Sequence, residues 1–204
     1  MRVCPLSWKS ARPASANRKR KWEGTEAMDC IKNRRSIRKF TTEPVCGDVL
    51  RSVVEAASYA PSWKNAQSVR YIAVSDKTLL AEIAEKCVMG FAYNQKTILN
   101  APLLVLVTTV SFRSGFDRDG AFSTSKGTHW ESFDAGIATQ TFCLAAYELG
   151  LGTTILGIYD EEQVIKAVRV PENQKVSAMI AVGYAAEMPT MPKRKNVDDL
   201  LTIC

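Results

Sequence analysis

An uninterrupted apolar run, LLVLVTTV at Leu103–Val110, sets the first limit on how this chain can fold. A strand with one solvated face alternates apolar and polar residues, whereas a continuous run of branched apolar residues is typical of a strand covered on both faces. The run therefore predicts a central strand with other elements packed on both sides of it.

Residue spacing around this run predicts a mixture of helices and strands. Val49 and Val53 recur at helical spacing and predict a helix over 48–59, while branched and aromatic residues predict a strand over 69–75. Further helices are expected at 29–33, 77–88, 93–99, 130–149 and 160–168, and further strands at 153–158 and 176–182. Because the order does not repeat strand–helix–strand strictly, the pattern favours an α+β sheet with helices on its faces.

The net charge of +6 is concentrated at the N-terminus. Residues 1–27 hold seven Lys or Arg against two Glu, a net +5, whereas residues 28–204 hold 20 basic and 19 acidic residues, a net +1. The leader has no packing periodicity and lacks the apolar core of a secretory signal. We interpret it as the result of a start codon assigned upstream of the true one at Met28. The alternatives are a transit peptide and a disordered tail that binds nucleic acid. The organised domain is expected to span residues 28–204.

The cysteines and the single histidine argue against a metal site. Six cysteines are scattered without a C-x-x-C pair, and His129 alone cannot form a multi-histidine site. No G-x-G-x-x-G follows a strand and no P-loop is present, which leaves a Rossmann site unsupported. Since no apolar run reaches the roughly 18 residues of a membrane helix, we expect a cytoplasmic protein with reduced thiols.

A run of basic residues around one serine, Arg34-Arg35-Ser36-Ile37-Arg38, is the first candidate binding site. Guanidinium forks bind phosphate oxygens in pairs and a hydroxyl adds one donor, so the run suits a dianionic phosphate. Most short basic clusters are solvated surface, and that remains the alternative. A second cluster, Lys193-Arg194-Lys195, lies far away in the sequence, and a nearly neutral body would need both to neutralise a phosphate.

Four motifs in order resemble those of the FMN-dependent nitroreductase family. They are the basic run, Pro61-Ser62-x-x-Asn65-x-Gln67, Gly150-Leu151-Gly152…Leu156-Gly157, and the basic close at 193–195. The resemblance covers about residues 28–204 and implies a mixed or antiparallel sheet flanked by helices in an intertwined homodimer, with FMN between the subunits. It also implies an oxidoreductase that takes a hydride from NAD(P)H onto flavin N5 and reduces a nitroaromatic, a quinone or a similar acceptor by a ping-pong mechanism.

The resemblance further implies which residues bind FMN. The basic run and the basic close match positions around the phosphate, the ribityl chain and the pyrimidine edge, and Asn94 matches a polar residue on the pyrimidine side. The loop at 61–67 matches one that the other subunit lays against the flavin, and the backbone N–H groups of Leu156 and Gly157 match those facing N5. The expected cofactor-binding residues are Arg34, Arg35, Ser36, Arg38, Pro61, Ser62, Trp63, Asn65, Gln67, Asn94, Leu156, Gly157, Lys193 and Arg194. No catalytic side chain is expected, because the flavin carries the chemistry.

The chain departs from the family pattern in three places. Trp63-Lys64 stands where small polar residues are usual, Ser68-Val69 replaces Pro-Trp, and Asn196 replaces a common Pro. An indole beside the flavin loop could narrow the acceptor space or stack on an aromatic acceptor. The irregular segment 111–128 is a candidate lid, and Asp134 is expected to be structural. The alternatives are a reductive dehalogenase, a flavin-fragmenting relative and a non-catalytic flavin-binding module.

Overall fold

The computed structural model describes residues 27–204, so the predicted leader lies outside the described residues except for its last position. The helices are α1 (Ala27–Asn33), α2 (Gly47–Ser58), α3 (Lys77–Lys86), α4 (Ala92–Asn100), α5 (His129–Glu148) and α6 (Glu161–Val168), with 3-10 turns η1 (Trp63–Asn65) and η2 (Val197–Asp199). The strands are β1 (Val69–Val74), β2 (Leu103–Val110), β3 (Gly152–Leu156) and β4 (Gln174–Gly183). Every predicted element is present, with ends shifted by up to two residues.

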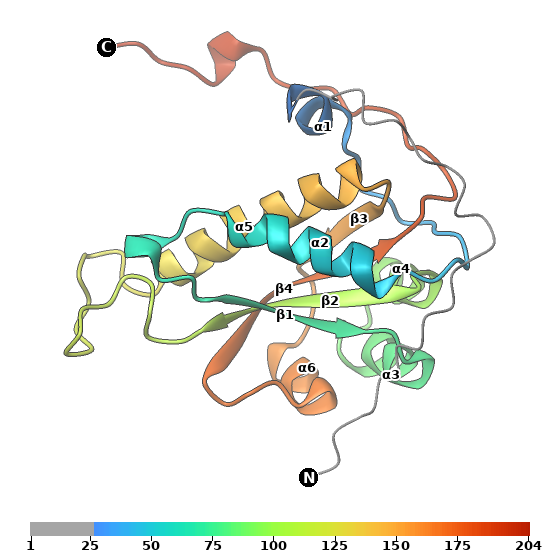
Figure 1. Cartoon of the computed structure of the whole chain (residues 1–204), viewed down its shortest axis with the longest axis horizontal. Coiled ribbons are helices and arrows are strands. Elements are labelled where there is room, and N and C mark those ends of the chain that lie inside the picture. Colours follow the sequence, from blue (N-terminus) through green and yellow to red (C-terminus); the bar gives the residue numbers. More distant parts are fainter. Residues whose placement is uncertain (1–26) are drawn as a thin grey trace.

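The four strands form one antiparallel sheet in the order β1-β2-β4-β3. The apolar run is β2, which pairs with β1 on one side and with β4 on the other (Figure 1). The predicted central strand is therefore confirmed. One parallel bridge, between Ser36 and Thr153, adds the segment after α1 to the outer edge of β3.

Helices cover both faces of the sheet, which explains why β2 carries no polar alternation. Leu104 and Leu106 pack against α3, α4 and α6, while Val105 and Val107 pack on the other face against α2 and α5 (Figure 1). All four side chains are fully buried. A strand covered by apolar layers on both faces carries apolar side chains on both, as Leu103 to Val107 do. No helix among residues 27–204 is long and apolar enough to cross a membrane.

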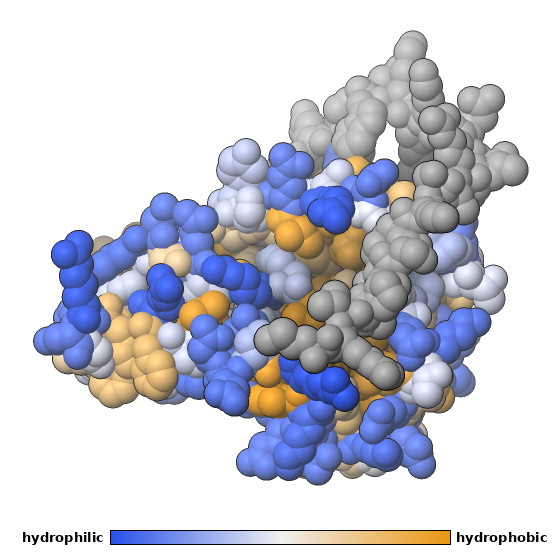
Figure 2. Space-filling model, turned by 60° about the horizontal axis from the view of Figure 1, so that its bottom comes forward, coloured by the Kyte–Doolittle hydropathy of each residue, from blue (hydrophilic) through white to orange (hydrophobic). Residues whose placement is uncertain are grey.

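Two segments extend beyond this two-faced core (Figure 1). The lobe, defined as residues 111–128, projects from one end of the sheet, and apolar atoms reach its surface among hydrophilic ones (Figure 2). Phe112 and Phe122 are more than half exposed there. The C-terminal tail, residues 186–204, is exposed throughout and runs away from the body.

Candidate functional site

The basic run lies against the first residues of β3. Ile37 N–H donates to the Thr153 carbonyl at 2.9 Å, beside the Ser36–Thr153 bridge. A Cβ on Gly152 would lie 2.7 Å from Ile37 Cγ1, so only glycine permits this approach. Gly150 adopts the left-handed conformation that ends α5, with φ of 81°. Gly150 thus turns the chain after α5, and Gly152 leaves room for the basic run to pack against β3.

Arg34 holds a buried donor that lacks a partner. Its Nε has no hydrogen-bond acceptor among the described residues, although its backbone N–H bonds to the Cys30 carbonyl. The guanidinium also lies near Cys143. Burial raises the pKa of that thiol, against a hydrogen bond with Thr153 and the Arg34 charge, which act in the opposite direction. Because an unsatisfied buried donor is costly, Arg34 Nε is a candidate donor to a ligand.

The other arginines of the run make local contacts. Arg35 Nη1 donates to the carbonyls of Lys32 at 2.6 Å and Arg34 at 2.9 Å, which satisfies the end of α1. Arg38 Nη1 lies 3.5 Å from the Ser36 carbonyl and is exposed. The run therefore presents two half-buried arginines, Arg34 and Arg35, and an exposed Arg38 at the edge of β3.

The loop at 61–67 has a strained backbone. Lys64, Asn65 and Gln67 have positive φ values of 44°, 56° and 45°, although none is glycine. Each such residue costs about 1 kcal/mol or more and persists only where its surroundings enforce it. Part of the enforcement is local, because Ser62 Oγ accepts the Gln67 N–H at 2.9 Å. Since that oxygen accepts this bond, the Ser62 hydroxyl can still donate its own proton to another group.

Asp134 on α5 joins this loop to the lobe. Its Oδ2 accepts the Trp63 N–H at 2.9 Å and the Ser114 hydroxyl at 2.6 Å. Ser114 Oγ in turn lies 3.0 Å from Ser68 Oγ. The Asp134 side chain is buried at 2 % exposure. The prediction that Asp134 is structural left this connecting role unseen, because no sequence motif surrounds it.

Aromatic and ionic contacts reinforce the junction between loop and lobe. The rings of Trp63 and Trp130 are 4.7 Å apart between centroids, and Lys64 Nζ lies 3.2 Å from Asp117. Trp130 Nε1 donates to Thr124, whereas Trp63 Nε1 is buried without an acceptor among the described residues. The loop is therefore in contact with both the lobe and the start of α5.

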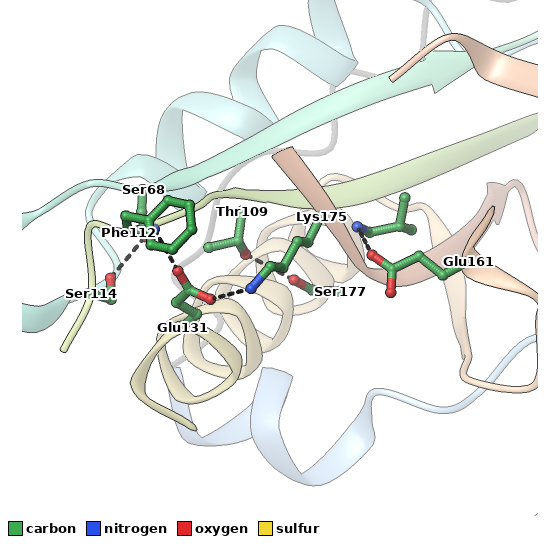
Figure 3. A network of polar contacts seen from close by, with 9 residues as sticks. Ser68, Thr109, Phe112, Ser114, Glu131, Glu161, Lys175 and Ser177 are labelled. Carbon is green, nitrogen blue, oxygen red and sulfur yellow. Dashed lines mark hydrogen bonds and ion pairs between the residues drawn. The ribbon is translucent and has the colours of Figure 1, made fainter. Parts of the chain in front are cut away.

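A second polar junction fixes the start of the lobe (Figure 3). The buried Glu131 accepts the Phe112 N–H at 2.8 Å and pairs with Lys175 at 3.1 Å. This junction uses the same face of α5 as Asp134, one turn earlier, but no hydrogen bond joins it to the loop at 61–67 within the described part of the chain. A small cleft of about 210 Å³ beside it is lined by Thr109, Thr128, Glu131, Ser132, Glu161, Lys175, Val176 and Ser177.

Asn94 and the end of β3 form a third group. Asn94 is buried, and its Nδ2 donates to the Ile158 carbonyl at 2.9 Å. Leu156 is the last residue paired with β4, so Gly157 lies just beyond the ladder and is exposed. Asn94 thus binds the residue that directly follows Gly157.

The basic run and the loop at 61–67 lie at different ends of α5. The loop contacts Asp134 and Trp130, whereas Arg34 lies near Cys143. Asp134 and Cys143 are nine positions apart, or about 14 Å along the axis at about 1.5 Å per residue. Lys193 and Arg194 are exposed on the tail, with no hydrogen bond or ion pair to another residue of the range 27–204. One chain therefore does not gather the four motifs at one point.

A cleft between α2, β1 and α5 contains part of the predicted set. Its volume is about 520 Å³, and Pro61, Ser62 and Gln67 line it together with Tyr71 and Asp134. Burial raises the pKa of Tyr71 to about 12, so its hydroxyl stays protonated at neutral pH. Neither Tyr71 nor Asp134 stands out in the sequence, because isolated residues within a strand and a helix give no pattern.

Comparisons with known proteins agree with the fold and the motifs. Residues 31–184 match the model of the nitroreductase family. The FMN reductase (NAD(P)H) of Bacillus subtilis is 30 % identical over 186 residues, which cover 82 % of this chain and 71 % of that protein. A nitroreductase family protein from Clostridium novyi NT superposes with a TM-score of 0.68 at 27 % identity, over 78 % of this chain and 86 % of its own. An FMN-dependent nitroreductase from Clostridium difficile R20291 gives 0.64 at 27 % identity, over 85 % and 94 %.

Proposed function

The chain belongs to the nitroreductase family, and we propose that it is a homodimeric, FMN-dependent oxidoreductase that uses NAD(P)H to reduce a small electron-poor acceptor. The observation that carries this proposal concerns buried donors. Only Arg34 Nε and Trp63 Nε1 are buried side-chain nitrogen or oxygen atoms without a partner in the described residues. These two atoms belong to two of the four motifs expected to contact the cofactor, the basic run and the loop at 61–67.

FMN would supply the redox chemistry, taking a hydride at N5 from NAD(P)H and passing it to a nitroaromatic, a quinone or a similar acceptor in ping-pong order. The residues of the basic run suit its phosphate. Arg34 offers a buried Nε, while Arg35, Ser36 and Arg38 offer further donors beside it. Lys193 and Arg194 supply additional positive charge from the tail.

The end of β3 would orient the isoalloxazine ring. The β3–β4 pairing ends at Leu156, which leaves the backbone of Gly157 outside the sheet. A Cβ on Gly157 would meet nothing within 4 Å, so the approach to this backbone is open. Backbone N–H groups of Leu156 and Gly157 would donate toward the ring edge, and Asn94 would hold the segment in place through the Ile158 carbonyl.

A second subunit would complete the site. The basic run and the loop at 61–67 are separated along α5, so a single ligand touching both needs the loop from another copy. The tail supports this arrangement, because it carries apolar side chains that one subunit leaves in water. The most exposed of them are Met188, Met191, Val197, Leu200, Leu201 and Ile203.

Anaerobic absorption spectroscopy tests the proposal. The purified protein, reconstituted with FMN, is expected to show flavin bands that bleach on addition of NADH or NADPH and return when menadione or a nitroaromatic is added. A protein that cannot be reconstituted with FMN would contradict the whole proposal. If FMN binds but neither nucleotide reduces it, the proposed oxidoreductase activity is contradicted, whereas the proposed FMN-binding site is supported. Analytical ultracentrifugation on the same sample tests the dimer.

A further inference from the structure

We infer that Asp134 is a positioning residue for the cofactor site: its carboxylate fixes the loop at 61–67 in its ligand-facing shape and aligns the lobe with it. This inference rests on the proposed function, because the loop is assigned to the flavin there. Near-ultraviolet circular dichroism of the protein without FMN provides a test that does not depend on cofactor binding.

The first step is the position of the Asp134 carboxylate. A single oxygen, Oδ2, accepts from the Trp63 backbone and from the Ser114 hydroxyl, at 2.9 and 2.6 Å. Both Asp134 and Ser114 are buried, at 2 % and 0 % exposure. Hydrogen bonds to a carboxylate are stronger than those to a neutral oxygen, and water does not compete with buried ones. The group therefore holds two distant segments in one fixed arrangement.

The Asp134 oxygen holds the strained part of the loop at 61–67. The bonded N–H is that of Trp63, which lies between Ser62 and the left-handed residues Lys64 and Asn65. A loop with such a backbone relaxes unless outside contacts hold it. The bonds inside the loop, such as Gln67 N–H to Ser62 Oγ, connect only its own residues. Asp134 supplies the hydrogen bond that attaches the loop to the rigid α5.

The third step is the coupling to the lobe. Ser114 shares the Asp134 oxygen with the Trp63 N–H. The Trp63 ring also contacts Trp130 of α5, and Lys64 pairs with Asp117 of the lobe. The aromatic surface of the lobe is thereby kept at a fixed distance from the loop. Removal of the carboxylate breaks both hydrogen bonds at once, so it would alter the shape of the loop and its alignment with the lobe together.

Glu131 provides a matched control. It lies one turn earlier on the same helix and is equally buried, and it also anchors the lobe through Phe112. No hydrogen bond joins it to the loop at 61–67 in the described residues. A general loss of packing around the start of α5 would affect Glu131 and Asp134 variants alike, whereas positioning through the Trp63 N–H would affect only Asp134 variants.

The experiment compares Asp134→Ala, Asp134→Asn, Glu131→Ala and Glu131→Gln in the full chain. FMN affinity is measured by fluorescence titration, and the Trp63–Trp130 contact is followed by near-ultraviolet circular dichroism without FMN. We expect Asp134→Ala to raise the FMN Kd at least tenfold and to reduce the tryptophan signal. Asp134→Asn, which keeps an acceptor oxygen of similar size, should recover most of the affinity. The Glu131 variants should leave the FMN Kd within about twofold of the wild type.

Two results would overturn the inference while leaving the proposed function intact. One is FMN affinity in both Asp134 variants within twofold of the wild type. The other is an equal loss in the Glu131 and Asp134 variants, which would indicate general destabilisation. If Asp134→Ala does not fold, the Asp134→Asn and Glu131→Gln pair decides. The neutral acceptor in Asp134→Asn should leave a partial loss, about a two- to fivefold rise in the FMN Kd with a smaller tryptophan signal, whereas Glu131→Gln should change neither. No difference between the two variants would overturn the inference. A wild-type protein that binds no FMN would overturn the proposed function and this inference together.

Discussion

Gly152 and Ile37 are in direct contact: a Cβ atom on Gly152 would lie 2.7 Å from Ile37 Cγ1 and 2.9 Å from Ile37 Cβ. Ile37 is buried at 3 % exposure and lies between Ser36 and Arg38 in the basic run. The contact fixes how closely the run can approach β3. The position of Arg34 and Ser36 therefore depends on the absence of one methyl group.

The variant Gly152→Ala tests this dependence. Overpacking at a site that cannot yield costs about 1–3 kcal/mol, so we expect a loss of that size in the free energy of unfolding, together with weaker FMN binding. Urea unfolding and FMN titration measure the two effects. Gly136→Ala is the control, because its Cβ meets nothing within 4 Å in α5. Alanine there should stabilise the helix by about 0.5–1 kcal/mol. Unchanged FMN binding in Gly152→Ala would contradict the prediction.

The variant Arg34→Ala should weaken FMN binding at least tenfold. A hydrogen bond to a charged group contributes about 1.5–3 kcal/mol, and a tenfold change in Kd corresponds to about 1.4 kcal/mol. The stability of the protein without FMN should hold or rise, because the variant removes an unsatisfied buried donor. Lys166→Ala makes the same change in charge on an exposed face of α6 and should leave the FMN Kd unchanged. Equal effects of the two variants would assign the result to net charge.

The variant Arg169→Gly should stabilise the protein. Arg169 ends α6 in the left-handed conformation, with φ of 58°, and Val170 N–H closes the turn on the Ile165 carbonyl. Glycine adopts this conformation without the Cβ conflict. The expected gain is about 0.5–1 kcal/mol, since relief of strain exceeds the added entropy of the unfolded chain. Arg169→Ala, which keeps the Cβ, should show no such gain in urea unfolding, and a similar gain would implicate the lost charge.

Acid should loosen the lobe from the loop at 61–67. The Ser123 hydroxyl and the nearby Lys64 lower the pKa of Asp117. A lowered folded-state pKa means that this contact stabilises the fold above the unfolded-state pKa and is lost as pH falls through the folded value. We expect the Trp63–Trp130 circular dichroism to weaken below about pH 4, the range in which aspartate ordinarily titrates. Asp117→Asn should remove this pH dependence, and an identical acid profile in that variant would contradict the assignment.

The sequence predicted the elements well because their signals are local. The run at Leu103–Val110 is apolar from Leu103 to Val107 since this part lies between two helical layers, and the pattern is visible without a structure. Some ends were harder to place: the helix expected to reach Val88 ends at Lys86, because Cys87 and Val88 turn into the core before a left-handed Met89 and Gly90. Such ends depend on tertiary burial that no window of residues records.

The candidate site was predictable only as far as its motifs. Arg34 and Trp63 were identified from the sequence, but their buried, unpartnered donors became apparent only in three dimensions. The connection of Trp63, Ser114 and Asp134 joins residues up to 71 positions apart. Side chains that meet across such separations leave no periodic signal, so isolated Asp134 was indistinguishable from an ordinary helix residue.

The left-handed residues at 64, 65 and 67 have a practical consequence for selection experiments. Glycine would suit all three backbone conformations better than Lys, Asn or Gln do. The chain nevertheless has Lys, Asn and Gln at these positions, where glycine would give a more stable fold. Two of the three, Asn65 and Gln67, belong to the expected flavin contacts. A selection for thermostable variants should therefore recover glycine substitutions at these three positions early. The variants that carry them should have lost catalytic activity.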